Sequence, residues 1–181
     1  MERRKKSMPI KTYLEAGQIV GTHGVRGEVR VQPWCDTPAQ LEPLHTLYWD
    51  DAGAAPVKVR CRAHKNLVLT KLEGVETVQE AAALRGRVLF LHRDDLHLEP
   101  GRRFIQDLLG LPVADADTGE VYGTLTDVSA TGANDVYHMR TASQPEREIL
   151  IPAIPSVVIE TDVEAGIVRI RPMKGLLDDA D

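Results

Sequence analysis

The feature that most constrains the fold of this sequence is a series of short runs in which apolar and polar residues alternate, separated by turn-forming residues. The run from Glu28 to Gln32 is clear, because valines alternate there with charged or polar side chains. Alternation with period two is typical of a strand that buries one face, and Gly, Pro, Asp and Asn between such runs mark turns. The first half of the chain is predicted to form six strands, at Leu14–Val20, Glu28–Gln32, Thr46–Trp49, Val57–Arg62, Leu67–Leu72 and Arg87–Leu91.

The second half of the chain has the same character and begins after the polar segment Arg93 to Arg103, which contains a Pro-Gly pair. We therefore predict an all-β fold of two small antiparallel six-stranded β-barrels joined by a short linker. The strands predicted for the second barrel are Pro112–Ala116, Val121–Val128, Asp135–Arg140, Glu148–Ile151, Val157–Glu160 and Ile167–Arg171.

One short helix is predicted within the first barrel, and the sequence contains a recognisable signal at each of its ends. Thr77 is followed three residues later by Glu80, which is the spacing of a capping box. The strong helix formers Ala81 to Leu84 come next, and Gly86 suits a left-handed stop. We expect this helix to cover an end of the barrel.

These elements give an expected domain organisation. A flexible basic arm is predicted at residues 1–12, a first barrel at 13–93, a linker at 94–101, a second barrel at 102–178 and a short tail at 179–181. The arm carries four consecutive basic residues, which we expect to form a solvated tail; non-specific attraction to RNA is the alternative.

The composition excludes several classes of protein. Hydrophobic residues make up 43% of the chain and charged residues 27%, which is enough for a buried core and a solvated surface. No apolar run approaches the roughly 20 residues that cross a bilayer, and no apolar segment follows the basic start, so neither a membrane protein nor a secreted one is expected. Cys35 and Cys61 are the two cysteines, and no C-x-x-C motif occurs. We expect a reduced, cytoplasmic protein.

The net charge of −5 is divided unequally along the chain. Residues 1–97 carry 15 Lys and Arg against 12 Asp and Glu, a net of +3, whereas residues 98–181 carry 7 against 15, a net of −8. A basic half tolerates nucleic acid and an acidic half attracts basic partners. On charge alone, two solvated surfaces of different composition are an equally good interpretation.

The segment "GTHGVRGEVRV", residues 21–31, is the clearest motif. It leads into a strand and not into a helix, so it lacks the helix N-terminus with which a nucleotide-binding loop holds phosphate. A catalytic role for His23 would need a nucleophile or an orienting carboxylate, and no local motif supplies one. We predict a hairpin turn whose glycines set its shape, with arginines that could contact phosphate and a histidine that faces the turn or RNA. The glycines are Gly21, Gly24 and Gly27, and the contact residues are His23, Arg26 and Arg30.

The remaining candidates for chemistry are weak. The segment "HRDDLH", residues 92–97, matches no zinc or calcium spacing, and Ser129 lies in no nucleophile elbow. Trp34 could stack on a base, but large aromatic side chains more often pack, and we expect packing. No enzyme activity, cofactor or metal is predicted.

Four segments, in order, resemble one known family. "GQIVGTHGVRGEVRV" resembles the signature of the bacterial ribosome maturation factors called RimM, or 16S rRNA-processing proteins. "DLLGLPVADADTGEVYGTLTDVSATGANDVYHMR" resembles the start of the second domain of that family, a PRC-barrel, and "EILIPAIPSVV" and "PMKGLLD" resemble its later segments. The likeness extends from about Leu14 to Asp178, which is nearly the whole chain.

The resemblance implies an assembly factor without catalytic activity, which we expect to be a monomer. Members of this family bind the free 30S small subunit and not the finished ribosome, and they assist maturation of the head region of 16S rRNA. Their protein partner is ribosomal protein S-nineteen, a basic protein of that head. A general RNA-binding protein and a small-molecule-binding PRC-barrel protein are the rival interpretations.

The resemblance also suggests a protein-binding site. Family members often carry two adjacent tyrosines just before the "DLLG"-like segment, and these are implicated in contact with the ribosomal protein. Arg103 and Phe104 occupy those positions here, ahead of Asp107, so the aromatic ring is kept once and the hydroxyls are lost. We expect acidic residues in turns of the second half to be exposed and to attract the same partner, namely Asp115, Asp117, Asp135 and Glu164.

Overall fold

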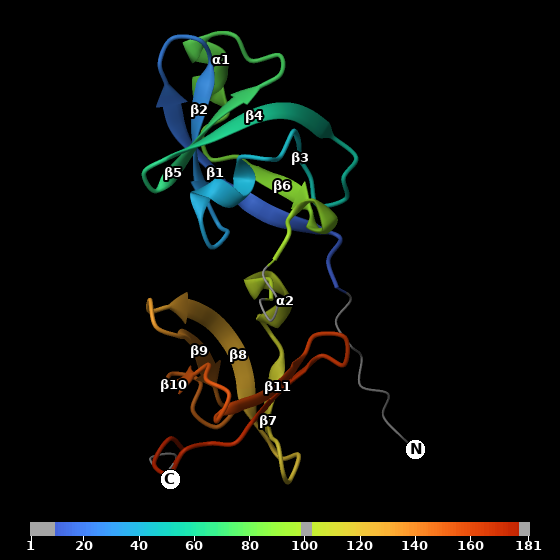
Figure 1. The fold of residues 1–181 in the computed structure, drawn as a ribbon, viewed down its shortest axis with the longest axis vertical. Helices are drawn as coiled ribbons and strands as arrows, with labels where there is room; N and C mark the ends of the chain where they lie inside the picture. Colours follow the sequence, from blue (N-terminus) through green and yellow to red (C-terminus); the bar gives the residue numbers. More distant parts are fainter. Residues whose placement is uncertain (1–9, 99–102, 178–181) are drawn as a thin grey trace. The chain divides into compact units, whose positions relative to one another are not determined.

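The computed structural model describes residues 10–98 and 103–177 (Figure 1), and its contacts divide the chain into two compact units. The described part of the first unit is residues 11–98, and that of the second is residues 103–177 together with residue 10. Each unit has its own sheet. The predicted arm up to residue 9, the end of the predicted linker at 99–101 and the predicted tail at 179–181 lie outside the described residues.

The first unit is a closed barrel of six strands, and this part of the prediction is confirmed. The strand order around the barrel is β1-β2-β5-β4-β3-β6, and every neighbouring pair is antiparallel. The strands are β1 (Tyr13–His23), β2 (Glu28–Pro33), β3 (Thr46–Tyr48), β4 (Pro56–His64), β5 (Leu67–Leu72) and β6 (Val88–His92).

Alternation in the sequence determines which side chains fill this barrel. Val29 on β2 is directly opposite Thr70 on β5, which in turn is opposite Cys61 on β4. Directly paired residues lie on the same face of a sheet, and all three are buried. The Thr70 hydroxyl and the Cys61 thiol, whose sulfur and oxygen are 3.6 Å apart, satisfy each other inside the apolar core.

The helix of the first unit, α1 (Val78–Ala83), has the predicted capping box. The Thr77 hydroxyl accepts a hydrogen bond from the backbone N–H of Glu80 at 3.2 Å, and the Glu80 carboxylate accepts one from the Thr77 N–H at 3.0 Å. The backbone N–H of Glu76, followed by the N–H and hydroxyl of Thr77, holds the pKa of Glu80 below its usual value. The helix packs on β1 and β2, at the same end of the barrel as the loop between these strands (Figure 1).

Two short 3-10 helices in the first unit were not predicted. They are η1 (Pro38–Leu41) and η2 (Arg93–Asp95). In η1 the Gln40 side chain accepts a hydrogen bond from the Thr37 N–H at 3.1 Å, and Leu41 is buried in the core. Propensity is uninformative for elements of three or four residues, because they form too few hydrogen bonds for a pattern to appear.

The second unit is a six-stranded sheet with one helix, α2 (Ile105–Leu108), which was not predicted. The strand order is β10-β9-β8-β7-β12-β11. The strands are β7 (Pro112–Asp115), β8 (Val121–Ala130), β9 (Asp135–Arg140), β10 (Glu148–Pro152), β11 (Val158–Asp162) and β12 (Ile167–Ile170).

The prediction of an entirely antiparallel second sheet is wrong at one pair. Strands β7 and β12 run parallel, with Val113 opposite Val168. Alternation shows that a segment is a strand but carries no information on the direction of its neighbour, so the error lies in topology and not in strand assignment. Closure of this sheet into a barrel stays a prediction, because β10 and β11 stand at the two ends of the strand order.

The core of the second unit is formed by the inner face of this sheet and by α2. Leu125 on β8 is opposite Met139 on β9, and both are buried. Leu108 from α2 belongs to the same buried cluster, which explains why this single helical turn forms after an extended segment. The other members of the cluster are Leu111, Val113, Tyr137, Ile149, Ile151, Val157, Val168 and Ile170.

Candidate functional site

The glycine-rich segment forms a tight loop between β1 and β2, but it is shorter than predicted. Strand β1 continues to His23, which pairs with Glu28, so only residues 24–27 form the turn. Gly21 is opposite Arg30 in the strand, just after an irregularity in the register of β1. This irregularity lets the strand continue, and Gly21 is therefore part of β1 and not of the turn.

Gly27 is required in this loop for two separate reasons. Its φ is +75°, in the left-handed region that side chains disfavour. A Cβ added there would also lie 2.5 Å from the carbonyl oxygen of Val75, in the segment that precedes α1. The other loop glycine, Gly24, has φ +62° but faces open space. The close approach at Gly27 therefore packs the loop on the segment before α1.

Lys71 on β5 ties the same two segments together. Its ammonium donates to the backbone carbonyl of Arg26 at 2.6 Å and to that of Val75. It also forms an ion pair with the Glu76 carboxylate at 3.0 Å. Three acceptors around one half-buried ammonium fix the loop against the barrel end. We did not identify Lys71 from the sequence, although its place between buried Thr70 and Leu72 marks an outward position on a strand.

The tip of the loop presents one apolar and one basic side chain to solvent. Val25 is 81% exposed, and Arg26 beside it is also exposed. Within the described residues the Arg26 guanidinium has neither a hydrogen-bond nor an ion-pair partner, although its carbonyl is held by Lys71. The backbone is thus anchored while the guanidinium is free, an arrangement suited to a forked contact with phosphate.

The other two residues predicted for this site have partners within the barrel. The Arg30 Nε donates to the backbone carbonyl of Thr22 at 2.8 Å, which braces β2 against β1. The ring of His23 lies 6.2 Å from the ring of His64, centroid to centroid. The loop leads directly into β2, so it has no helix N-terminus with which to bind a nucleotide.

Arg103, Phe104 and Asp107 lie together at the start of α2. Phe104 precedes the helix, and its carbonyl accepts a hydrogen bond from the Asp107 N–H at 3.0 Å. Phe104 and Asp107 are half-buried, whereas Arg103 is exposed. Burial and the negative charge of Asp135 raise the pKa of Tyr137, while a hydrogen bond with Thr161 and the positive charge of Arg103 act in the opposite direction. The segment before α2 thus places a cation near a buried phenol.

Asp115 is not an exposed acidic residue, contrary to expectation. It is 9% exposed, and its carboxylate accepts hydrogen bonds from the Tyr122 hydroxyl at 2.6 Å and from the N–H groups of Asp117 and Thr118. The Tyr122 hydroxyl, followed by these backbone donors, lowers the pKa of Asp115 to about 2. Burial and the neighbouring carboxylate raise the pKa of Tyr122 to about 12. Asp115 closes the turn between β7 and β8.

The other three acidic candidates have different surroundings. Asp117 is exposed but receives two hydrogen bonds from Arg171, at 2.8 and 2.9 Å. Glu164 is exposed in the turn between β11 and β12. Asp135 is half-buried. Of the four acidic residues expected to attract a basic partner, Glu164 alone is exposed and has neither an ion-pair nor a hydrogen-bond partner among the described residues.

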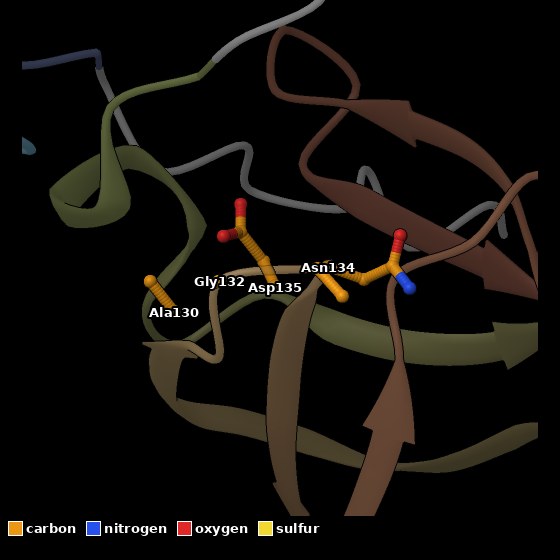
Figure 2. Close-up of a pocket in the computed structure, with 5 residues that line it drawn as sticks. Ala130, Gly132, Asn134 and Asp135 are labelled. Atoms are coloured by element: carbon orange, nitrogen blue, oxygen red, sulfur yellow. The ribbon is translucent and has the colours of Figure 1, made fainter.

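A shallow hollow in the second unit is lined by the turn between β8 and β9. Its volume is about 270 Å³, and its lining residues are Ala130, Gly132, Ala133, Asn134 and Asp135. Figure 2 shows the Asn134 and Asp135 side chains pointing away from each other. Small-molecule sites are larger and bring polar groups together, so this hollow gives no support to a small-molecule function.

Three polar side chains on neighbouring strands of the second unit form a Ser–His–Glu arrangement that the sequence did not reveal. His138 Nε2 lies 2.8 Å from the Ser129 hydroxyl, and its Nδ1 lies 3.1 Å from the Glu148 carboxylate. The three residues are brought together only by strand register. Ser129 lies within β8, whose backbone pairs with β9, and not at a turn that would aim free N–H groups at an oxyanion. The arrangement is a polar cross-strand ladder.

Trp34 is more exposed than the expected packing implies. It follows β2, and its backbone N–H donates to the carbonyl of Ala16 at 3.0 Å. Its side chain is 42% exposed.

Among the described residues, no helix has the length and apolar character needed to cross a membrane.

Comparison with known protein families gives a match to each unit. The family model of the RimM N-terminal domain matches residues 14–96, and that of the RimM PRC barrel domain matches residues 105–176. The two matches occupy the two units in the order expected from the sequence.

Similar proteins cover nearly the whole chain. The ribosome maturation factor RimM of Clostridium botulinum is 35% identical over 166 residues, which is 91% of this chain and 97% of that protein. The RimM of Geobacter metallireducens is 36% identical over 90% of this chain and 94% of its own length. A crystal structure of a 16S ribosomal RNA processing protein RimM from Pseudomonas aeruginosa is 28% identical, covers 89% of this chain and 98% of its own, and aligns with a TM-score of 0.41. With both domain models matched and relatives of this identity spanning it almost end to end, the chain belongs to the RimM family of ribosome maturation factors.

Proposed function

We propose that this protein is a ribosome assembly factor that binds the free 30S small subunit and assists maturation of the head region of 16S rRNA, without catalysing a reaction. The observation that carries the proposal is that both family domains match in order, together with relatives named ribosome maturation factors along nearly the full chain. Binding of ribosomal protein S-nineteen is part of the same proposal.

The first unit supplies the contact with rRNA. Arg26 stands at the tip of a loop whose backbone is fixed by Lys71 and by the close packing of Gly27. Because the loop backbone is already ordered, binding of an RNA phosphate to the free guanidinium costs little conformational entropy. His23 and Arg30 lie on the strands that carry this loop and complete the proposed contact.

The second unit supplies the contact with the ribosomal protein. Residues 98–181 carry a net charge of −8, which favours encounter with a basic partner. Phe104 is the half-buried aromatic residue at the start of α2, with Arg103 and Asp107 beside it. In this arrangement exposed acidic groups speed association, whereas the aromatic residue slows dissociation.

A strain that lacks this protein tests the proposed function. We expect such cells to accumulate precursor 16S rRNA in their small subunits, and a plasmid copy of the wild-type chain to restore processing. A copy carrying Ser129→Ala is expected to restore it equally, because the Ser–His–Glu ladder has no catalytic part in the proposal. Normal 16S processing in the deleted strain would refute the proposal.

A further inference from the structure

The outer surface of the barrel carries a larger group of basic residues that includes Arg30, on the three neighbouring strands β2, β5 and β4. On β4 the residues Lys58, Arg60 and Arg62 alternate with buried Val59 and Cys61, so all three basic side chains point outward. Arg30 on β2 and Lys71 on β5 lie on the same outer surface, because they pair in register with outward residues of their neighbours. We call these five basic residues the β4 face.

Strand register places four residues of the β4 face in two rows, and Lys58 lies outside both. One row runs from Glu28 through Lys71 to Arg60, and the other runs from Arg30 through Leu69 to Arg62. Leu69 points outward yet is 1% exposed. Long arginine side chains cover apolar surface with their stems while their guanidinium groups stay in water, and Leu69 is flanked in register by two of them.

The charges on the β4 face differ in how far they are neutralised. Arg62 forms a long ion pair with Glu28 at 3.5 Å, and Lys71 is engaged by the loop and by Glu76. In the part of the chain that the structure describes, the side chains of Lys58 and Arg60 are exposed and have neither an ion-pair nor a hydrogen-bond partner. Glu73 is the acidic residue next to Lys58, linked through its backbone N–H to the Lys58 carbonyl at 2.9 Å.

The β4 face is continuous with the glycine loop. Lys71, which is opposite Arg60 in register, donates to the carbonyl of Arg26. Basic side chains therefore extend from the loop tip through Lys71 and Arg60 to Lys58, which precedes Arg60 by two residues on β4. Neighbouring strands are about 5 Å apart and successive outward residues on one strand about 7 Å apart, so these side chains can meet successive charges of a polyanion.

We propose that the β4 face binds the sugar-phosphate backbone of double-stranded rRNA, with Lys58 and Arg60 making phosphate contacts that continue from Arg26. The inference rests on the proposed function and specifies which surface and which form of RNA it uses. Proteins that hold single-stranded RNA use aromatic side chains on which bases stack. The outward residues of β2, β5 and β4 are charged, polar or aliphatic, with His64 as the one aromatic ring, and the partly exposed Trp34 lies beyond the end of β2. Contacts to a duplex backbone therefore fit this surface better.

The test compares two double variants of the full chain that remove the same charge. Lys58→Gln with Arg60→Gln removes two cations from the β4 face. Arg85→Gln with Arg87→Gln removes two exposed cations from the other half of the barrel, where Arg87 stacks on Trp49. Thermal unfolding of each variant is measured first, and we expect both to unfold within a few degrees of wild type, because these side chains are exposed.

Binding is then measured by fluorescence anisotropy to a labelled 20-base-pair RNA duplex and to a 20-nucleotide poly-uridine strand, at several salt concentrations. We expect the β4-face variant to bind the duplex about tenfold more weakly, with a salt slope reduced by about two, since each lost phosphate contact lowers the slope by about one. The control variant is expected to change both quantities much less. Equal effects of the two variants, or a larger loss on poly-uridine than on the duplex, would overturn the proposal.

The same variants are tested for binding to purified free small subunits, which separates this inference from the proposed function. Weaker subunit binding by the β4-face variant than by the control supports the inference when duplex binding is weakened as well. If subunit binding falls while duplex binding does not, the face contacts a protein and the inference is wrong. If the wild-type chain does not bind small subunits, the proposed function fails, whereas the duplex measurement still decides whether the β4 face binds RNA.

Discussion

Two glycines of the same four-residue loop have different structural roles, and substituting each one should have a different effect on stability. Gly24→Ala places a side chain at φ +62° in open space, so it should cost about 1 kcal/mol of unfolding free energy. Gly27→Ala adds a Cβ 2.5 Å from the Val75 carbonyl oxygen as well as the left-handed penalty, and should cost about 2–4 kcal/mol. Urea unfolding of both variants measures the difference. Equal costs would show that the loop does not pack on the segment before α1.

Asp115 makes a specific contribution to acid stability. Its pKa in the fold is about 2, below the ordinary value of 3.8, so the folded state favours the carboxylate. The stability that this group contributes is complete above about pH 4 and is lost as the pH falls toward 2. The contribution of Tyr122 to stability has the opposite pH dependence, because its pKa is raised from 10.0 to about 12. That contribution is lost as the pH rises through this range.

Asp115→Asn tests this assignment. The variant should be less stable than wild type at pH 7, and its stability should fall less steeply between pH 4 and pH 2, because the group that titrates there is gone. Guanidinium unfolding at a series of pH values measures both effects, with Glu164→Gln, an exposed carboxylate, as the control. An unchanged slope in Asp115→Asn would mean that other carboxylates dominate acid unfolding.

At the scale of elements, Lys71 joins β5 to two other segments through a single ammonium group. Replacing it with methionine keeps the apolar stem and removes the bonds to the Arg26 and Val75 carbonyls. We expect faster hydrogen exchange at Gly27 and in the segment before α1, and a loss of about 1 kcal/mol in stability. Lys65→Met, at an exposed turn position, is the matched control. Exchange rates equal to those of the control would contradict the positioning role.

Strand assignment could be predicted from the sequence much more fully than contacts between strands. All twelve predicted strands are present, and the bounds of Leu67–Leu72 and Asp135–Arg140 are those observed, because alternation records which face is buried. The capping box at Thr77 could be predicted equally well, since it is an interaction between residues close in sequence. Direction and register depend on distant segments, which is why the parallel pairing of β7 with β12 was missed.

The candidate site was partly predictable for the same reason. The exposed Arg26 follows from local chemistry at a glycine-rich turn. The tie from Lys71 and the burial of Asp115 depend on residues brought close by folding, Val75 in one case and Tyr122 in the other. A carboxylate in a polar turn looks exposed in the sequence, and only the position of the tyrosine hydroxyl shows otherwise.

At the scale of the whole molecule, the two units are proposed to hold different partners. Phe104→Ala should accelerate dissociation from ribosomal protein S-nineteen more than Glu164→Gln does, because a buried aromatic contact limits dissociation whereas an exposed charge mainly affects association. Surface plasmon resonance with the full chain measures both rates, and thermal unfolding confirms that each variant is folded. A slower association with unchanged dissociation in Phe104→Ala would contradict this role.

The most direct measurement of the central claim is the sedimentation of this protein with ribosomal particles. Purified chain is mixed with a cell extract containing free small subunits, free large subunits and complete ribosomes, and the gradient fractions are probed for it. We predict that it sediments with free small subunits and their precursors, and that Arg26→Ala reduces this fraction and lowers the salt dependence by about one unit in slope. Sedimentation with complete ribosomes, or a position at the top of the gradient apart from all particles, would contradict the account.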